Sequence, residues 1–199
     1  MSISCSAEKP ALASSEAHTT LAMISLAASA HAPVTRLPLE VVAVVDRSGS
    51  MSGEKMQTMK QTLTFLVSKG LQNGDSLAIV SFDDTVETRL ELTTMDGTGK
   101  AKALKAIDQL HPGRTTNLSG GLLQGIDLLQ RAPAPASGST RAVLLFTDGI
   151  ANVGIRDGPG IVAAAHGAMA GAASSAPMTL FTFGFGSDHN EDMLRALAD

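Results

Sequence analysis

Aromatic residues are scarce in this chain of 199 residues: they make up 3%, and neither tryptophan nor tyrosine occurs. This scarcity argues against binding of nucleic acids or sugars by stacking on aromatic side chains. Basic residues are also outnumbered by acidic ones, with a formal net charge of -4, which argues against a partner with a phosphate backbone. We therefore expect no nucleic-acid partner.

Cysteine is nearly absent too, since Cys5 is the only one, which excludes an intrachain disulfide and a cysteine-rich zinc site. A reducing compartment fits, and we expect a cytoplasmic protein. No apolar run is long enough to span a membrane. Residues 20–32 do have the apolar character of a signal peptide, and secretion is the alternative if they act as one. The acidic residues Glu8 and Glu16 before them, and Pro33 after them, favour a leading strand instead.

The chain does have enough apolar material for one domain with a sizeable core, with 44% hydrophobic and 17% charged residues. Strand patterns alternate with helix patterns from about residue 39 onward. They predict an α/β fold: a doubly wound, mostly parallel sheet with helices on both faces. Residues 86–92 alternate apolar and polar, which predicts one antiparallel hairpin strand. We expect a disordered leader (1–18), a leading strand and loop (19–38) and the α/β domain (39–199).

One stretch concentrates polar donors at the end of an apolar run. Residues 41–45 are apolar, Asp46 follows them, and Ser48 and Ser50 come next at alternate positions. The run indicates a strand buried on both faces, and ligands bind beyond the carboxyl ends of such strands. One carboxylate and two hydroxyls are hard oxygen donors that suit Mg²⁺. At this point the serines could also be ordinary loop residues, with Ser50 capping the next helix.

Two further residues lie in comparable places. Asp148 comes just after the predicted buried strand 141–146 and Thr147, much as Asp46 follows its own strand, and Thr116 lies in a loop just before a helix. In a doubly wound sheet these loops share one edge, and they meet if the two strands are neighbours at the switch point. The combined set then offers two carboxylates and three hydroxyls. Asp83 and Asp84 are also paired acids, but at a hairpin tip we expect them to be turn formers.

This set, from Asp46 in Asp-x-Ser-x-Ser to Thr116 and Asp148, resembles the metal-ion-dependent adhesion site of von Willebrand factor A (vWA) domains, and the likeness covers about residues 39–198. The resemblance implies that Ser48 and Ser50 ligate Mg²⁺ or Mn²⁺ directly, and Thr116 directly or through water. It implies that Asp46 and Asp148 act largely through water or as supporting acceptors. A looser likeness is to intracellular vWA proteins of algae, plants and protists.

The resemblance also implies a function. Two carboxylates balance a divalent ion, while hydroxyls add no charge, so the ion stays electrophilic and keeps an exchangeable position. An aspartate or glutamate of a protein partner can fill that position. We therefore expect a metal-dependent, adhesion-type module for protein–protein interaction and not an enzyme.

Two alternatives stay open. The first is a metal-dependent phosphoester hydrolase built on Asp46, although Ser48 stands where such enzymes carry a second acid. The second is a structural interaction domain whose metal site is empty. The chain also departs from the family pattern in one place, because the usual sixth strand after the last helix is missing when the chain ends at Asp199. We expect either a truncated domain or an open edge strand at 178–185.

Overall fold

The computed structural model describes residues 2–7, 22–27, 36–133, 139–149, 151–170, 177–186 and 189–199. The chain forms two compact units, one of residues 1–36 and one of residues 37–199. The domain boundaries expected from the sequence stay predictions.

The first unit contains an antiparallel pair of strands, β1 (Ser2–Ala7) and β2 (Ala22–Ala27). Strand β2 falls in the segment where we expect a leading strand. Strand β1 lies where the sequence alone predicts a disordered leader, so the structure differs from that prediction at these residues. Its residues alternate between serine and a less polar residue, which is the period of a strand, but the run is too weakly apolar to stand out.

The second unit alternates strands and helices. Its elements in chain order are β3 (Leu39–Asp46), η1 (Gly49–Met51), α1 (Glu54–Phe65), η2 (Leu66–Gly70), β4 (Ser76–Phe82), β5 (Val86–Thr94), α2 (Gly97–Asp108), α3 (Leu118–Arg131), β6 (Thr140–Thr147), α4 (Gly158–Ala170), β7 (Met178–Gly184) and α5 (Glu191–Ala198). The described strands form one sheet in the order β5-β4-β3-β6-β7. Only β5 is antiparallel to its neighbour, so the predicted α/β fold is confirmed.

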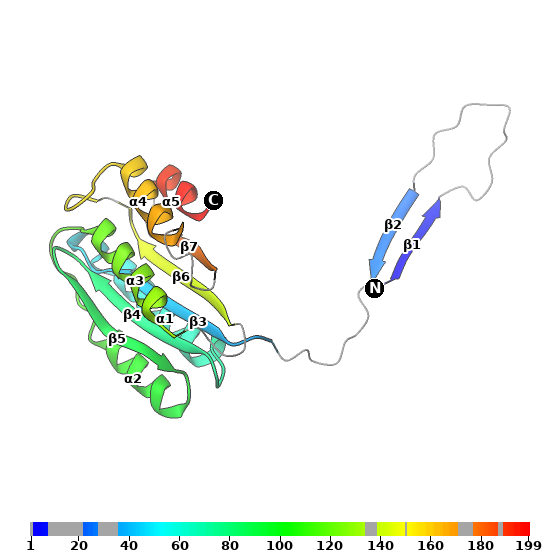
Figure 1. Ribbon diagram of the computed structural model, residues 1–199, viewed down its shortest axis with the longest axis horizontal. Coiled ribbons are helices and arrows are strands. Elements are labelled where there is room, and N and C mark those ends of the chain that lie inside the picture. The colour runs from blue at the N-terminus through cyan, green and yellow to red at the C-terminus, as the bar shows by residue number, and fades with distance from the viewer. Residues whose placement is uncertain are drawn as a thin grey trace. The chain divides into compact units, whose positions relative to one another are not determined.

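Helices cover both faces of this sheet (Figure 1). Alternate residues of the central strand β3 point to opposite faces: Val41, Ala43 and Val45 join the core under α1 and α2. Val42 and Val44 join the core under α3, α4 and α5. A strand that is buried on both faces must be apolar throughout, which explains the apolar run read from the sequence.

The switch point of the sheet lies between β3 and β6. The chain passes from β3 to β4 on one side and later returns to β6 on the other, and β3 and β6 pair in parallel with Val45 opposite Phe146. Asp46 and Thr147 therefore end two neighbouring strands at the same edge. Crevices at such switch points are where open α/β sheets bind ligands.

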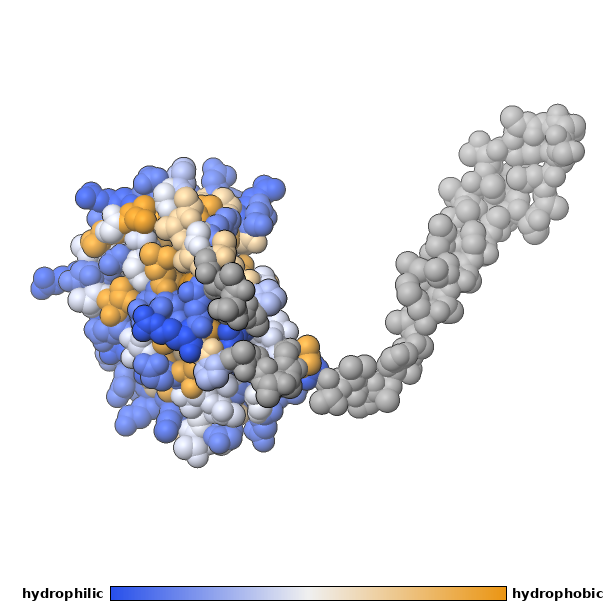
Figure 2. Space-filling model, viewed as in Figure 1, coloured by the Kyte–Doolittle hydropathy of each residue, from blue (hydrophilic) through white to orange (hydrophobic). Residues whose placement is uncertain are grey.

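Within the described residues β7 is an edge of the sheet. Its Phe181 and Phe183 are partly exposed, and Phe183 stacks on Phe146 at 4.8 Å between ring centroids. On the face of the second unit in Figure 2, apolar residues lie in several separate groups between hydrophilic ones. Of the helices that the structure describes, none is both long and apolar enough to cross a membrane.

Candidate metal centre

Asp46 is the last residue of β3, and both oxygens of its buried carboxylate accept hydrogen bonds. Oδ1 accepts a hydrogen bond from the Ser48 backbone N–H at 2.8 Å, and Oδ2 accepts one from the Thr147 hydroxyl at 2.6 Å. Burial raises the pKa of Asp46 and the charge of Asp148 adds to this effect, although the bonds from Ser48 and Thr147 oppose it. A cation beside Asp46 would therefore relieve an unfavourable negative charge.

Ser48 and Ser50 lie on the turn that follows β3. Ser48 is buried, Ser50 is exposed, and their hydroxyl oxygens are 3.1 Å apart. The short turn η1 begins directly after Ser48, and it brings the two alternate hydroxyls together. The N-cap of α1 is Gly53, without a side-chain cap bond, so the reading of Ser50 as a helix cap is wrong.

Thr116 is buried in the loop before α3, and both its backbone N–H and its carbonyl form hydrogen bonds. Its N–H donates to the Asn152 side-chain oxygen at 2.8 Å, and its carbonyl accepts from the backbone N–H groups of Asn152 and Val153. The same loop contacts the first one, because the Gly49 N–H donates to the Arg114 carbonyl at 2.9 Å. The loop of Thr116 is thus tied to the loops that follow β3 and β6.

Asp148 follows β6 and is fully buried. Its Oδ2 lies 3.2 Å from the Lys55 ammonium, which reaches it from the first turn of α1. Its Oδ1 is buried and has no hydrogen-bond partner among the described residues. The next residue, Gly149, has a φ of 78° and donates its N–H to the Thr147 hydroxyl at 2.9 Å. This tight turn keeps the Asp148 carboxylate at the end of the strand.

Asp83 does more than form the predicted turn. It accepts the turn bond from the Thr85 N–H, but it is also buried and pairs with the Arg47 guanidinium at 2.8 Å. Its own carbonyl accepts from the Asn117 N–H, next to Thr116. Burial alone would raise the pKa of Asp83, but the Thr85 hydrogen bonds and the Arg47 charge together hold that pKa below its usual value.

The structure therefore connects the three predicted loops by hydrogen bonds and places the hydroxyls of Ser48 and Ser50 side by side. Sequence reasoning missed the residues that hold them: Lys55, Thr147, Asn152 and the Arg47 partner of Asp83. Their contacts join segments that are far apart in the chain, and no local motif marks them. For Lys55, the only signal in the sequence is its place as a basic residue in the first turn of α1.

The donors present suit a hard cation. Within the described residues no three His, Cys, Asp or Glu side chains gather as a metal cluster. The predicted donors would not count as such a cluster, because only two of the five are carboxylates and the other three are hydroxyls. Oδ1 of Asp148 bears on this most, because it has no partner among the described residues, a buried carboxylate oxygen without one is strongly unfavourable, and a cation or its bound water would satisfy it. The residues present therefore fit Mg²⁺ or Mn²⁺.

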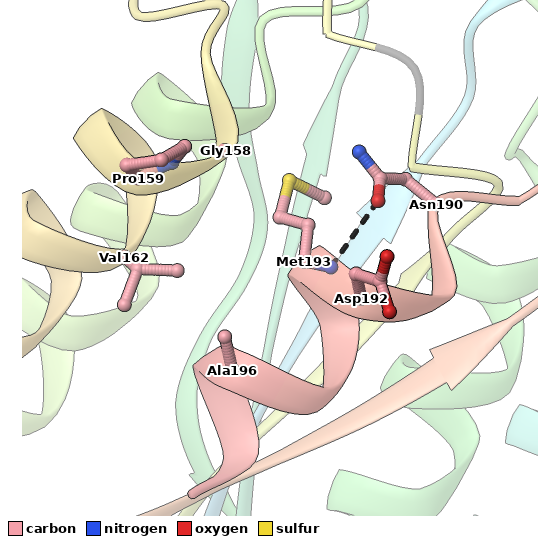
Figure 3. A pocket seen from close by; sticks show the side chains of 7 residues that line it. All are labelled: Gly158, Pro159, Val162, Asn190, Asp192, Met193 and Ala196. Carbon is pink, nitrogen blue, oxygen red and sulfur yellow. Dashed lines mark hydrogen bonds between the residues drawn. The ribbon is translucent and has the colours of Figure 1, made fainter.

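A separate surface pocket of about 440 Å³ lies between α4 and α5 (Figure 3). Asn190 caps α5 there, and its side-chain oxygen accepts from the Met193 N–H at 3.2 Å. Asp192 is the only charged residue of its lining, and most of the rest is apolar. With one carboxylate, and one amide oxygen that already caps α5, this pocket offers fewer oxygen donors than the loops at the switch point.

A doubly wound domain with polar loops at the switch point defines a class of ligand-binding α/β domains. The chain belongs to the von Willebrand factor type A domain family, whose model matches residues 40–199.

Relatives of known sequence include bacterial and animal proteins. The chain is 35% identical to YfbK of Escherichia coli over 161 residues, which cover 80% of this chain and 26% of YfbK. It is 31% identical to sll0103 of Synechocystis over 88% of this chain and 39% of that protein. It is 30% identical to the mouse inter-alpha-trypsin inhibitor heavy chain H3 over 81% of this chain and 18% of that protein. The chain thus spans well under half of these relatives, and its narrower likeness to algal, plant and protist proteins stays a prediction.

Solved structures share the fold. A von Willebrand factor type A protein from Catenulispora acidiphila matches with a TM-score of 0.66 and 23% identity, over 81% of this chain and 36% of that chain. Proximal thread matrix protein 1 of the mussel byssus matches with a TM-score of 0.62 and 23% identity, over 81% of this chain and 41% of that chain. At these identities the likeness concerns the fold alone.

Proposed function

We propose that this domain is a protein-interaction module that binds Mg²⁺ or Mn²⁺ at the switch point of its sheet. Ser48, Ser50 and Thr116 supply hydroxyl ligands, and Asp46 and Asp148 supply the balancing charge. The ion offers an exchangeable position to an aspartate or glutamate of a partner. Hydroxyl ligands leave the ion electrophilic enough to take up that carboxylate.

The observation that carries this proposal is the burial of two carboxylates at neighbouring strand ends, one of which has an oxygen without a hydrogen-bond partner among the described residues. Asp46 and Asp148 are both 0% exposed, and Oδ1 of Asp148 has no partner in the described part of the chain. Burying such groups is strongly unfavourable unless a cation or hydrogen bonds compensate. Membership of the vWA family and a relative named as an inhibitor heavy chain support an interaction module over an enzyme.

A second candidate is an interaction domain that works without a metal. One observation favours it: Lys55 already places a positive charge 3.2 Å from Asp148. In that case the lysine compensates the buried charge permanently, and the loops form a rigid polar surface. The two candidates differ in whether the domain takes up a divalent ion.

Calorimetric titration with Mg²⁺ and Mn²⁺ separates these candidates. The wild type should bind one ion, and Ser48→Ala or Asp148→Ala should abolish the heat while circular dichroism shows a folded domain. Ser52→Ala is the matched control, because Ser52 is an exposed serine of the same loop. Absence of heat from the wild type would favour the metal-free candidate.

Capture of an acid needs its own test. Immobilised peptides that contain glutamate, and matched peptides with glutamine in its place, serve as probes. Binding that requires both glutamate and Mg²⁺, and that EDTA reverses, supports the module. Capture that EDTA leaves unchanged contradicts it. Hydrolysis of a phosphoester that Asp46→Ala abolishes would point instead to the hydrolase alternative.

A further inference from the structure

Among the described residues, Lys55 is the partner of Oδ2 of Asp148, whereas Oδ1 has none. It is the second residue of α1, its side chain is 22% exposed, and its ammonium lies 3.2 Å from Oδ2. Helix α1 begins just after the loop of Ser48 and Ser50, so the same loop that supplies two hydroxyls also delivers this lysine. The ammonium is therefore fixed next to the proposed ion site from the start of a helix.

Two cationic side chains of the described residues pair with acids near this site, Arg47 with Asp83 and Lys55 with Asp148. Arg47 is engaged by Asp83 and does not neutralise the pair Asp46 and Asp148. In the absence of an ion, Lys55 offsets one of these two buried charges. A divalent ion offsets both charges and repels the ammonium that lies beside them.

The lysine also has space to move into. A second surface pocket, of about 520 Å³, is lined by Lys55, Glu54, Thr58 and residues 184–186. Glu54 is an exposed carboxylate of this lining that can receive an ammonium. A swing of a flexible lysine side chain into this pocket requires no rearrangement of the sheet.

We propose that Lys55 is a tethered counter-ion of the metal-free site, which a divalent ion displaces from Asp148 into the pocket beside Glu54. The lysine holds the buried carboxylate in place when the ion is absent and lowers the affinity for the ion by competing with it. This inference rests on the proposed metal-dependent function. It adds that binding of the ion and exposure of the Lys55 ammonium occur together.

The direct test is the acylation rate of lysines in the wild-type domain, followed by mass spectrometry of its peptides. Saturating Mg²⁺ should raise the rate at Lys55 several-fold. Lys69 is the internal control, because it is exposed and lies roughly 20 Å further along the same helical segment. Its rate should not change. Since this test uses no variant, it does not depend on the folding of a mutant.

The affinity for Mg²⁺ is the second readout. Lys55→Met should bind Mg²⁺ about tenfold more tightly, which corresponds to an ion pair of ~1.4 kcal/mol, and Lys69→Met should bind as the wild type does. Charge removal alone could also tighten binding, and for this reason the acylation rate decides.

The outcomes separate the two proposals. If the wild type binds Mg²⁺ but acylation of Lys55 does not rise, the displacement is refuted and the metal site stands. If neither the wild type nor Lys55→Met binds Mg²⁺, both proposals fail. If only Lys55→Met binds Mg²⁺, both proposals are refuted for the wild type, because no ion then displaces its lysine.

Discussion

Arg47 and Asp83 form an ion pair of 2.8 Å that joins the loop after β3 to the turn after β4. Their side chains are only 13% and 5% exposed. Because Arg47 stands between Asp46 and Ser48 in the chain, the pair fixes the backbone from which both of these residues project. The Asn117 N–H also binds the Asp83 carbonyl, so one aspartate positions two of the three loops.

Asp83→Asn should lower the free energy of unfolding at neutral pH. As the pH falls, that free energy should decrease less in the variant than in the wild type. The folded-state pKa of Asp83 lies below its usual value of 3.8, so its stabilising effect is complete above that value and is lost as the pH falls through the folded-state pKa. We expect a loss of about 1–3 kcal/mol at pH 7, because Arg47 loses its charged acceptor. Urea unfolding from pH 7 down to pH 3 measures this.

The difference between wild type and Asp83→Asn should shrink as the pH falls. Glu91→Gln is the control, since Glu91 is an exposed acid of the neighbouring strand β5. A constant difference across this pH range would show that the variant acts through packing and not through the charge of Asp83.

Thr147→Val should impair both the fold and the binding of Mg²⁺. The Thr147 hydroxyl donates to Asp46 at 2.6 Å and accepts from the Gly149 N–H at 2.9 Å, all in a buried place. Valine has nearly the same shape and leaves both groups without a partner, which costs about 1–3 kcal/mol. Thr179→Val on the exposed face of β7 is the control and should change neither property. Thermal unfolding and calorimetry with Mg²⁺ measure the two effects.

The positions of Asp46, Thr116 and Asp148 could be predicted because they depend on chain order. Each follows or precedes an element whose pattern is visible in the sequence, and parallel strands present their carboxyl ends at one edge. The neighbouring placement of β3 and β6 then brings Asp46 beside Thr147. A rule of topology therefore suffices for the location of the candidate site.

The supporting contacts could not be predicted in this way. Lys55 and Asp148 are 93 residues apart, and Arg47 and Asp83 are 36 apart. Such pairs depend on the register of loops and on rotamers, and the sequence offers no periodic pattern for either. The short strand β1 could not be predicted for a different reason, because its own residues alternate serine with less polar ones and are only weakly apolar.

Asn152→Ala should lower the affinity for Mg²⁺ while leaving the fold nearly intact. The Asn152 side chain accepts from the Thr116 N–H at 2.8 Å, but the residue itself is exposed, so we expect a loss of stability of only about 1 kcal/mol. Gln57→Ala, which removes an exposed amide from α1, should bind Mg²⁺ as the wild type does. Unchanged affinity in Asn152→Ala, together with loss in Thr116→Ala, would show that Asn152 does not position Thr116.

Gly125→Ala should destabilise the domain and weaken its affinity for Mg²⁺. Gly125 lies in α3 against the sheet, and a Cβ there would meet Cγ2 of Val44 at 2.3 Å. Val44 is a stiff, buried residue of β3, so helix and strand must separate, at a cost of about 1–3 kcal/mol. Because Thr116 stands just before α3 and Ser48 lies on the turn after β3, this separation also moves Thr116 relative to Ser48.

Gly167→Ala is the matched control for this substitution. Gly167 lies in α4, is exposed, and would have no atom within 4 Å of an added Cβ. Alanine there should raise stability by about 0.5–1 kcal/mol through helix propensity alone, with no effect on Mg²⁺. Opposite signs for the two substitutions in chemical denaturation, together with weaker Mg²⁺ binding by Gly125→Ala alone, would show that the close approach of α3 to β3, and not glycine content, sets the position of Thr116. A stabilising Gly125→Ala would contradict that approach.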